Sequence, residues 1–149
     1  MIHNKQNDII IRDVDTDNHD VLKDFVDDLN TFMGKYQDPL EETMEAIRLA
    51  IESGFCVEAV EKEDDRLGVL AITPSPFEKF QPKYHLAYIA TSLKARGRGV
   101  GKLLLKTSQE LTKGDIALHV GVNNDNAIKF YEKMGWKGHY LRMMPIEEK

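Results

Sequence analysis

A basic, glycine-rich run at residues 96–101, Arg-Gly-Arg-Gly-Val-Gly, is the segment of this sequence best suited to bind an anion. It lies between an expected strand and an expected helix, where unpaired backbone N–H groups and the positive end of the helix dipole meet. Glycine lets the backbone approach an oxyanion closely, and Arg96, Arg98 and Lys102 add positive charge. The run therefore predicts a phosphate-binding loop.

The spacing of the glycines excludes two common nucleotide motifs. The dinucleotide fingerprint G-x-G-x-x-G, begun at Gly97, requires a glycine where the sequence has Lys102. The P-loop pattern G-x-x-x-x-G-K-[ST] requires a first glycine at Arg96 and a Ser or Thr at Leu103. The run instead matches the pattern R-x-x-G-x-G.

A second motif follows at residues 124–136, which read Asn-Asp-Asn-Ala-Ile-Lys-Phe-Tyr-Glu-Lys-Met-Gly-Trp. With both motifs in this order, the chain resembles the GNAT N-acetyltransferase superfamily. The patterns of that family are [QR]-x-x-G-x-[GA] and N-x-x-A-x-x-x-Y-x-x-x-G-[FW]. The resemblance is close over residues 84–144, and the expected order of elements extends it over the whole chain.

The resemblance implies acetyl-CoA as co-substrate. In the family, the first motif binds the pyrophosphate of acetyl-CoA through backbone N–H groups, and the strand before it pairs with the pantetheine arm. Asn124 matches a position that often contacts the cofactor, although a helix N-cap is an equally good role for it. The implied cofactor-binding residues are Ile89, Thr91, Arg96, Gly97, Arg98, Gly99, Val100, Gly101, Lys102 and Asn124.

The resemblance also implies a catalytic residue, Tyr131. In many members of the family a tyrosine at this position protonates the departing thiolate of CoA, and its hydroxyl suits a general acid. The alternative is a core aromatic, because Tyr131 shares a helix face with Ala127 and Met134. An alkylamine must lose a proton before it attacks the thioester, and the candidates for that general base are His85, Glu58 and Glu61.

Two rival functions stay open. One is a non-catalytic domain of the same fold that binds or senses acyl-CoA, which would keep the glycine loop and could lose the acid. The other is a nucleotide-binding regulatory module, which the spacing of the glycines disfavours.

The elements that must position these residues alternate along the chain. Apolar residues at helical spacing follow Val21, and Asp38-Pro39 gives a helix start signal with Asp38 as the N-cap. Pro74, Pro76 and Pro82 predict a surface loop. The strands are expected at 8–14, 55–62, 67–73, 84–91, 116–122 and 138–144, and the helices at 21–33, 39–53, 100–113 and 124–134.

The fold class that follows is α/β (α+β), with the order β-α-α-β-β-β-α-β-α-β of a GNAT fold. Local hairpins in the first half predict antiparallel pairs, whereas the helical crossover between strands 84–91 and 116–122 requires a parallel pair. We expect a central mixed, mostly antiparallel sheet flanked by helices.

Composition predicts one globular domain over residues 1–149, with 42% hydrophobic and 30% charged residues. The one cysteine, Cys56, stands among apolar residues and is typical of a buried thiol. The histidines are scattered, so we expect no metal. The sequence has no apolar run of membrane length and no signal-like start, so we expect a cytoplasmic protein without a membrane partner.

Acidic residues are concentrated in the first half of the chain and basic residues in the second, within a net charge of -5. A phosphate-rich ligand would favour the second half, and a cationic substrate the first. We therefore expect a small-molecule or peptide amine as acceptor, cationic in character, such as a polyamine, an amino sugar or a lysine side chain. The net negative charge disfavours nucleic acid as a partner. Dimers are common in the family, so a homodimer is an open alternative.

Overall fold

The computed structural model describes residues 1–62, 65–76 and 82–147. The chain divides into two compact units, Met1–Leu118 and His119–Lys149. The first unit contains the sheet and three of the helices described below, and the second contains one helix and a C-terminal segment. The expectation of one domain over residues 1–149 stays a prediction.

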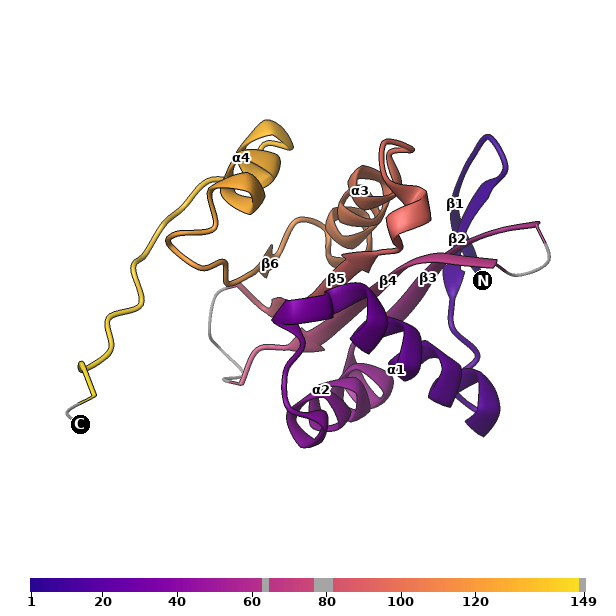
Figure 1. Cartoon of the computed structure of the whole chain (residues 1–149), viewed down its shortest axis with the longest axis horizontal. Helices are drawn as coiled ribbons and strands as arrows, with labels where there is room; N and C mark the ends of the chain where they lie inside the picture. The colour runs from indigo at the N-terminus through magenta and orange to yellow at the C-terminus, as the bar shows by residue number, and fades with distance from the viewer. Residues whose placement is uncertain (63–64, 77–81, 148–149) are drawn as a thin grey trace. The chain divides into compact units, whose positions relative to one another are not determined.

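A single sheet of six described strands, in chain order, forms the frame of the first unit (Figure 1). Neighbouring strands from β1 to β5 are antiparallel, and β5 and β6 are parallel. This arrangement confirms the mixed, mostly antiparallel sheet. The strands are β1 (Ile2–Gln6), β2 (Ile9–Asp13), β3 (Phe55–Glu61), β4 (Asp65–Pro74), β5 (Tyr84–Thr91) and β6 (Ile116–Ala117).

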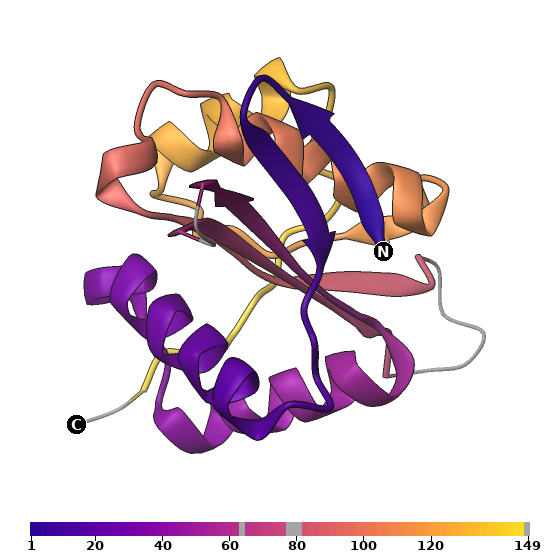
Figure 2. The same ribbon diagram turned by 90° about the vertical axis from the view of Figure 1, so that its right-hand side faces the viewer.

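Helices cover both faces of this sheet (Figure 2). Helices α1 (His19–Met33) and α2 (Leu40–Ser53) lie on one face, and α3 (Val100–Thr112) lies on the other. Two short 3-10 turns, η1 (Gly34–Tyr36) and η3 (Leu93–Ala95), precede α2 and α3. None of the helices in the described part of the chain combines the length and the apolar content needed to cross a membrane.

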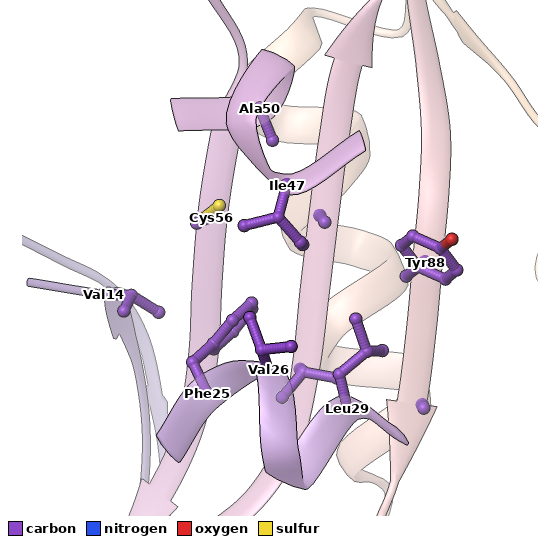
Figure 3. Packing of buried hydrophobic residues seen from close by; sticks show 11 residues of the cluster. Val14, Phe25, Val26, Leu29, Ile47, Ala50, Cys56 and Tyr88 are labelled. Carbon is purple, nitrogen blue, oxygen red and sulfur yellow. The ribbon is translucent and has the colours of Figure 1, made fainter. Parts of the chain in front are cut away.

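The core on the α1 and α2 face follows from helical and strand periodicity. Asn18 caps α1 by accepting hydrogen bonds from the N–H groups of Asp20 and Val21, at 3.1 and 3.2 Å. Figure 3 shows the apolar side chains of α1 and α2 pointing at the strands, where Cys56 and Tyr88 meet them. The helix residues of this core are Phe25, Val26, Leu29, Ile47 and Ala50.

The second unit contains α4 (Asp125–Lys133), whose C-cap Met134 is followed by Gly135 at a φ of 92°. Residues 137–147 form no regular secondary structure. The strand predicted at 138–144 is therefore wrong for the described chain. Its aromatic and apolar residues suit a strand, but no described strand pairs with it, and a strand exists only through such pairing.

Other differences from the expected elements have local causes. Strand β1 is not among the predicted strands, because its apolar and polar residues do not alternate. A two-residue turn with Asn7 at a φ of 56° joins it to β2. The strand expected at 116–122 is shortened to β6, which comprises only Ile116–Ala117.

The cap position of α2 is Pro39, because the carboxylate of Asp38 instead accepts a hydrogen bond from Tyr88. Part of the predicted proline loop, residues 77–81, lies outside the described residues.

Replacing Gly54 with alanine should destabilise the first unit. A Cβ atom there would lie 1.9 Å from the carbonyl oxygen of Ile72, and this backbone belongs to the β3–β4 ladder and cannot move without breaking it. We expect the free energy of unfolding to fall by more than about 2 kcal/mol in chemical denaturation. Gly138→Ala is the control, because a Cβ at Gly138 meets nothing within 4 Å. Equal stability of the two variants would contradict the close approach of Gly54 to the backbone of Ile72.

Candidate active site

The glycine-rich loop projects from the first unit between two buried anchors. Ala95 and Val100 are 3% and 1% exposed, whereas all four residues from 96 to 99 are exposed. Gly97 and Gly99 have φ values of 78° and 76°, a conformation that side chains rarely adopt, and nothing lies within 4 Å of a Cβ built on either. The loop therefore has a backbone shape that requires glycine and open space in front of it.

The start of α3 leaves backbone donors without partners. Gly99 is the N-cap, and no side chain caps the helix. The first helical hydrogen bond joins the Leu103 N–H to the Gly99 carbonyl at 3.0 Å, so the N–H groups of Val100, Gly101 and Lys102 have no partner among the described residues. The first turn also contains no acidic residue. Free donors and the positive end of the helix dipole at one place favour the binding of an anion.

Strand β4 fixes the position of this helix start. A Cβ on Gly68 would lie 2.8 Å from Leu104 Cδ1 and 3.0 Å from Val100 Cγ1, so the first turns of α3 pack directly on the strand backbone. The Ser92 N–H also donates to the carbonyl of Leu67 at 2.9 Å. Gly68 is not among the residues predicted to shape the site, although an isolated glycine within a strand is a signal of such a close approach.

The basic residues of the loop differ in their partners. Arg98 forms two hydrogen bonds with the carboxylate of Glu61, and Lys94 donates to Asp65. Arg96 and Lys102 form no ion pair with any residue that the structure describes. The resemblance implies a phosphate contact for Arg96, Arg98 and Lys102, so the Arg98–Glu61 pair is a new feature.

One edge of β5 is open beyond its first two residues. Strand β6 pairs only with Tyr84 and His85, and no described strand pairs with the same edge from residue 86 to residue 91. Ile89 and Thr91, the strand residues expected to bind the cofactor, lie on this stretch. An unpaired edge offers backbone donors and acceptors to an extended ligand.

Two of the three candidate general bases are already bound to arginine. Glu58 is 4% exposed; Arg12 donates to its Oε2 at 2.8 Å, and Arg66 donates twice to its Oε1. Arg98 holds the pKa of Glu61 below its usual value. A carboxylate with a lowered pKa is a poor proton acceptor at neutral pH, which disfavours Glu61 as the base. Glu58 is buried, so it could reach a substrate only by leaving its two arginine partners. His85 stays a candidate.

A hydrogen bond between Tyr88 and Asp38, also missed by the sequence analysis, ties β5 to the segment before α2. The Tyr88 hydroxyl donates to Asp38 Oδ2 at 2.8 Å, and burial raises the pKa of Tyr88. Tyr88 is 7% exposed and its neighbour Ile89 is on the open edge. The contact therefore steadies the strand that the cofactor is expected to contact.

The second unit contains the other two predicted site residues. Asn124 caps α4, because its Oδ1 accepts from the Ala127 N–H at 3.3 Å. The ring of Tyr131 lies 5.4 Å from that of Phe130 and 6.1 Å from that of Trp136. Burial raises the pKa of Tyr131, so its hydroxyl keeps its proton at neutral pH, as a general acid requires.

Cys56 is 6% exposed in the core, and burial, with a smaller contribution from the charge of Asp13, raises its pKa to about 12. A thiol with such a pKa is protonated at neutral pH, and only the thiolate is nucleophilic. This environment agrees with the expected buried, unreactive cysteine.

Comparison with known proteins identifies a family. The model of the Acetyltransferase (GNAT) family matches residues 20–136. No curated protein matches the chain significantly. Among solved structures, AAC(6')-Iy in complex with the bisubstrate analogue CoA-S-monomethyl-acetylneamine gives a TM-score of 0.72 at 13% identity, covering 96% of this chain and 100% of that chain.

Two other solved structures share the fold. The NatC complex bound to Gag peptide and CoA gives a TM-score of 0.68 at 16% identity, covering 93% of this chain and 87% of that chain. The aminoglycoside antibiotic 6'-N-acetyltransferase AAC(6')-IG from Acinetobacter haemolyticus, in its apo form, gives a TM-score of 0.66 at 13% identity. The match covers 93% of this chain and 97% of that chain. At these identities the similarity is one of fold.

The thiol of Cys56 should react slowly in the native protein. At about pH 8, we expect a chromogenic disulfide reagent to modify it at least about a hundred-fold more slowly in buffer than in denaturant, because burial suppresses both access and the thiolate. The reaction is followed by absorbance. Equal rates in buffer and in denaturant would show that the core around Cys56 is open.

Proposed function

The chain belongs to the acetyltransferase (GNAT) family, and from that premise we propose that it transfers an acetyl group from acetyl-CoA to a primary amine. The observation that carries the proposal is the start of α3. There an exposed loop in a glycine-only conformation presents free N–H groups beside Arg96 and Lys102. A diphosphate offers the charge and the acceptor oxygens that suit such a site.

The residues of the first unit suit the rest of the cofactor as well. The open edge of β5 at Ile89 and Thr91 can bind the amides of the pantetheine arm as an added strand would. Because these contacts use the backbone, they do not depend on the side chains of Ile89 and Thr91. In the second unit, Asn124 uses its oxygen as a helix cap, so a contact with the cofactor would use its amide nitrogen.

The reaction requires no covalent intermediate on the enzyme. Acetyl-CoA supplies an activated thioester, which the neutral amine attacks directly in a ternary complex. A backbone N–H on the open edge of β5 would donate to the developing oxyanion. Tyr131 would give its hydroxyl proton to the departing thiolate, and the amine would lose its proton to a base or to water, with His85 as the remaining candidate.

The acceptor is proposed to be a cationic amine. Helices α1 and α2 have many exposed carboxylates, including Asp20 and Asp24 on α1 and Glu41 and Glu45 on α2. Such a surface raises the local concentration of cations. Two structures with the same fold contain an acetylneamine analogue or a peptide, which supports an amine on a small molecule or a peptide.

Alanine at Gly99 should abolish most of the affinity for CoA, whereas alanine at Gly114 should not. Both glycines have positive φ values, 76° and 78°, and neither Cβ would meet an atom within 4 Å, so the two variants have the same backbone strain at opposite ends of α3. Only Gly99 borders the free N–H groups. We expect isothermal calorimetry to show CoA binding at least about ten-fold weaker for Gly99→Ala. Equal affinities would contradict the site.

Replacing Tyr131 with phenylalanine should lower kcat by about a hundred-fold and leave the Kd for CoA nearly unchanged, because the hydroxyl acts only when the thiolate departs. Tyr140→Phe is the control, since Tyr140 is 96% exposed in the same unit. The measurement is release of free CoA thiol with a panel of amines. Turnover of Tyr131→Phe at the wild-type rate would show that Tyr131 is not a catalytic residue. Absence of turnover by the wild type with any amine would favour a non-catalytic acyl-CoA binding domain.

A further inference from the structure

The β3–β4 hairpin places two carboxylates beside the glycine-rich loop. Glu61 is the last residue of β3 and Asp65 is the first of β4, and the ladder pairs them directly. Glu61 binds Arg98, and Asp65 binds Lys94, across 37 and 29 residues of sequence. The hairpin therefore holds two of the cations of this region while two others, Arg96 and Lys102, have no carboxylate partner in the described chain.

The contact between Arg98 and Glu61 uses both terminal nitrogens of the guanidinium and both oxygens of the carboxylate. Arg98 Nη1 donates to Glu61 Oε1 at 3.1 Å, and Nη2 donates to Oε2. A guanidinium binds a phosphate through the same pair of parallel N–H groups. Arg98 therefore cannot give these two donors to a phosphate and to Glu61 at the same time.

The pair is well placed to exchange partners. The side chains of Arg98 and Glu61 are 37% and 25% exposed, so water can reach both. An ion pair with this exposure contributes little to stability, so breaking it costs little. A phosphate-bearing ligand carries more negative charge than one carboxylate and also meets the free N–H groups of α3, which favours the exchange.

We propose that Glu61 is an affinity-determining residue, which competes with the phosphate groups of the cofactor for the guanidinium of Arg98. The inference rests on the function proposed above. Glu61 occupies Arg98 in the free protein and lowers the affinity for anions in general. Only a ligand with several phosphate charges and a fit to the helix start displaces it, so Glu61 sharpens selectivity for CoA over simple anions.

The test is calorimetric titration of CoA, at low salt, into the wild type, Glu61→Gln, Arg98→Gln and the double variant. We expect Glu61→Gln to bind CoA about five-fold more tightly, because Arg98 is then free and a like charge is gone. Glu52→Gln is the matched control: it removes the same charge from an exposed position on α2, across the sheet from α3, and should bind like the wild type (Figure 2). In the Arg98→Gln background, removing Glu61 should change the affinity less than about two-fold.

The outcomes separate the inference from the function on which it rests. Unchanged or weaker binding by Glu61→Gln would overturn the competition. A five-fold gain that persists in the Arg98→Gln background would also overturn it, since the gain would then come from general charge repulsion. Failure of the wild type to bind CoA would instead refute the proposed function.

Discussion

Helix α3 begins with backbone N–H groups that nothing else in the described chain satisfies, and the rest of the first unit holds that helix start in place. Gly99 gives the left-handed turn into the helix, and the buried Val100 anchors its first residue. Gly68 lets the helix approach β4 closely enough for this anchoring. A rigid, open donor site of this kind has its geometry fixed before a ligand arrives, which reduces the entropy lost on binding.

The sheet contributes a second feature, the unpaired edge of β5, because β5 and β6 pair over only two residues. Their parallel ladder involves only Tyr84 and His85, so the same strand that leads into the glycine-rich loop has an unpaired edge immediately before it. The buried side chains of Tyr88 and Ala90 fix the strand against α1 and α2. The proposed site places an extended arm on this edge and a diphosphate at the helix start, two features that follow each other along the chain.

Local signals in the sequence predicted the elements that carry the site, and long-range contacts decided what they missed. The β-rich run at 84–91 gave the bounds of β5, and the apolar positions at helical spacing from Val100 gave the start of α3. The partners of Glu58 and Glu61 could not be read in this way, because Glu58 binds Arg12, 46 residues away, and Glu61 binds Arg98, 37 residues away. The pattern at 138–144 failed for a similar reason, since a strand depends on a neighbour that local sequence does not specify.

Amide chemical shifts measured by NMR during a titration with CoA test the central claim most directly. If the N–H groups at the start of α3 donate to the diphosphate, the amide signals of Val100, Gly101 and Lys102 should shift strongly and saturate with the ligand, while Gly114 at the far end of the helix should hardly move. Saturable binding with these three amides unmoved, or no binding, would contradict the account.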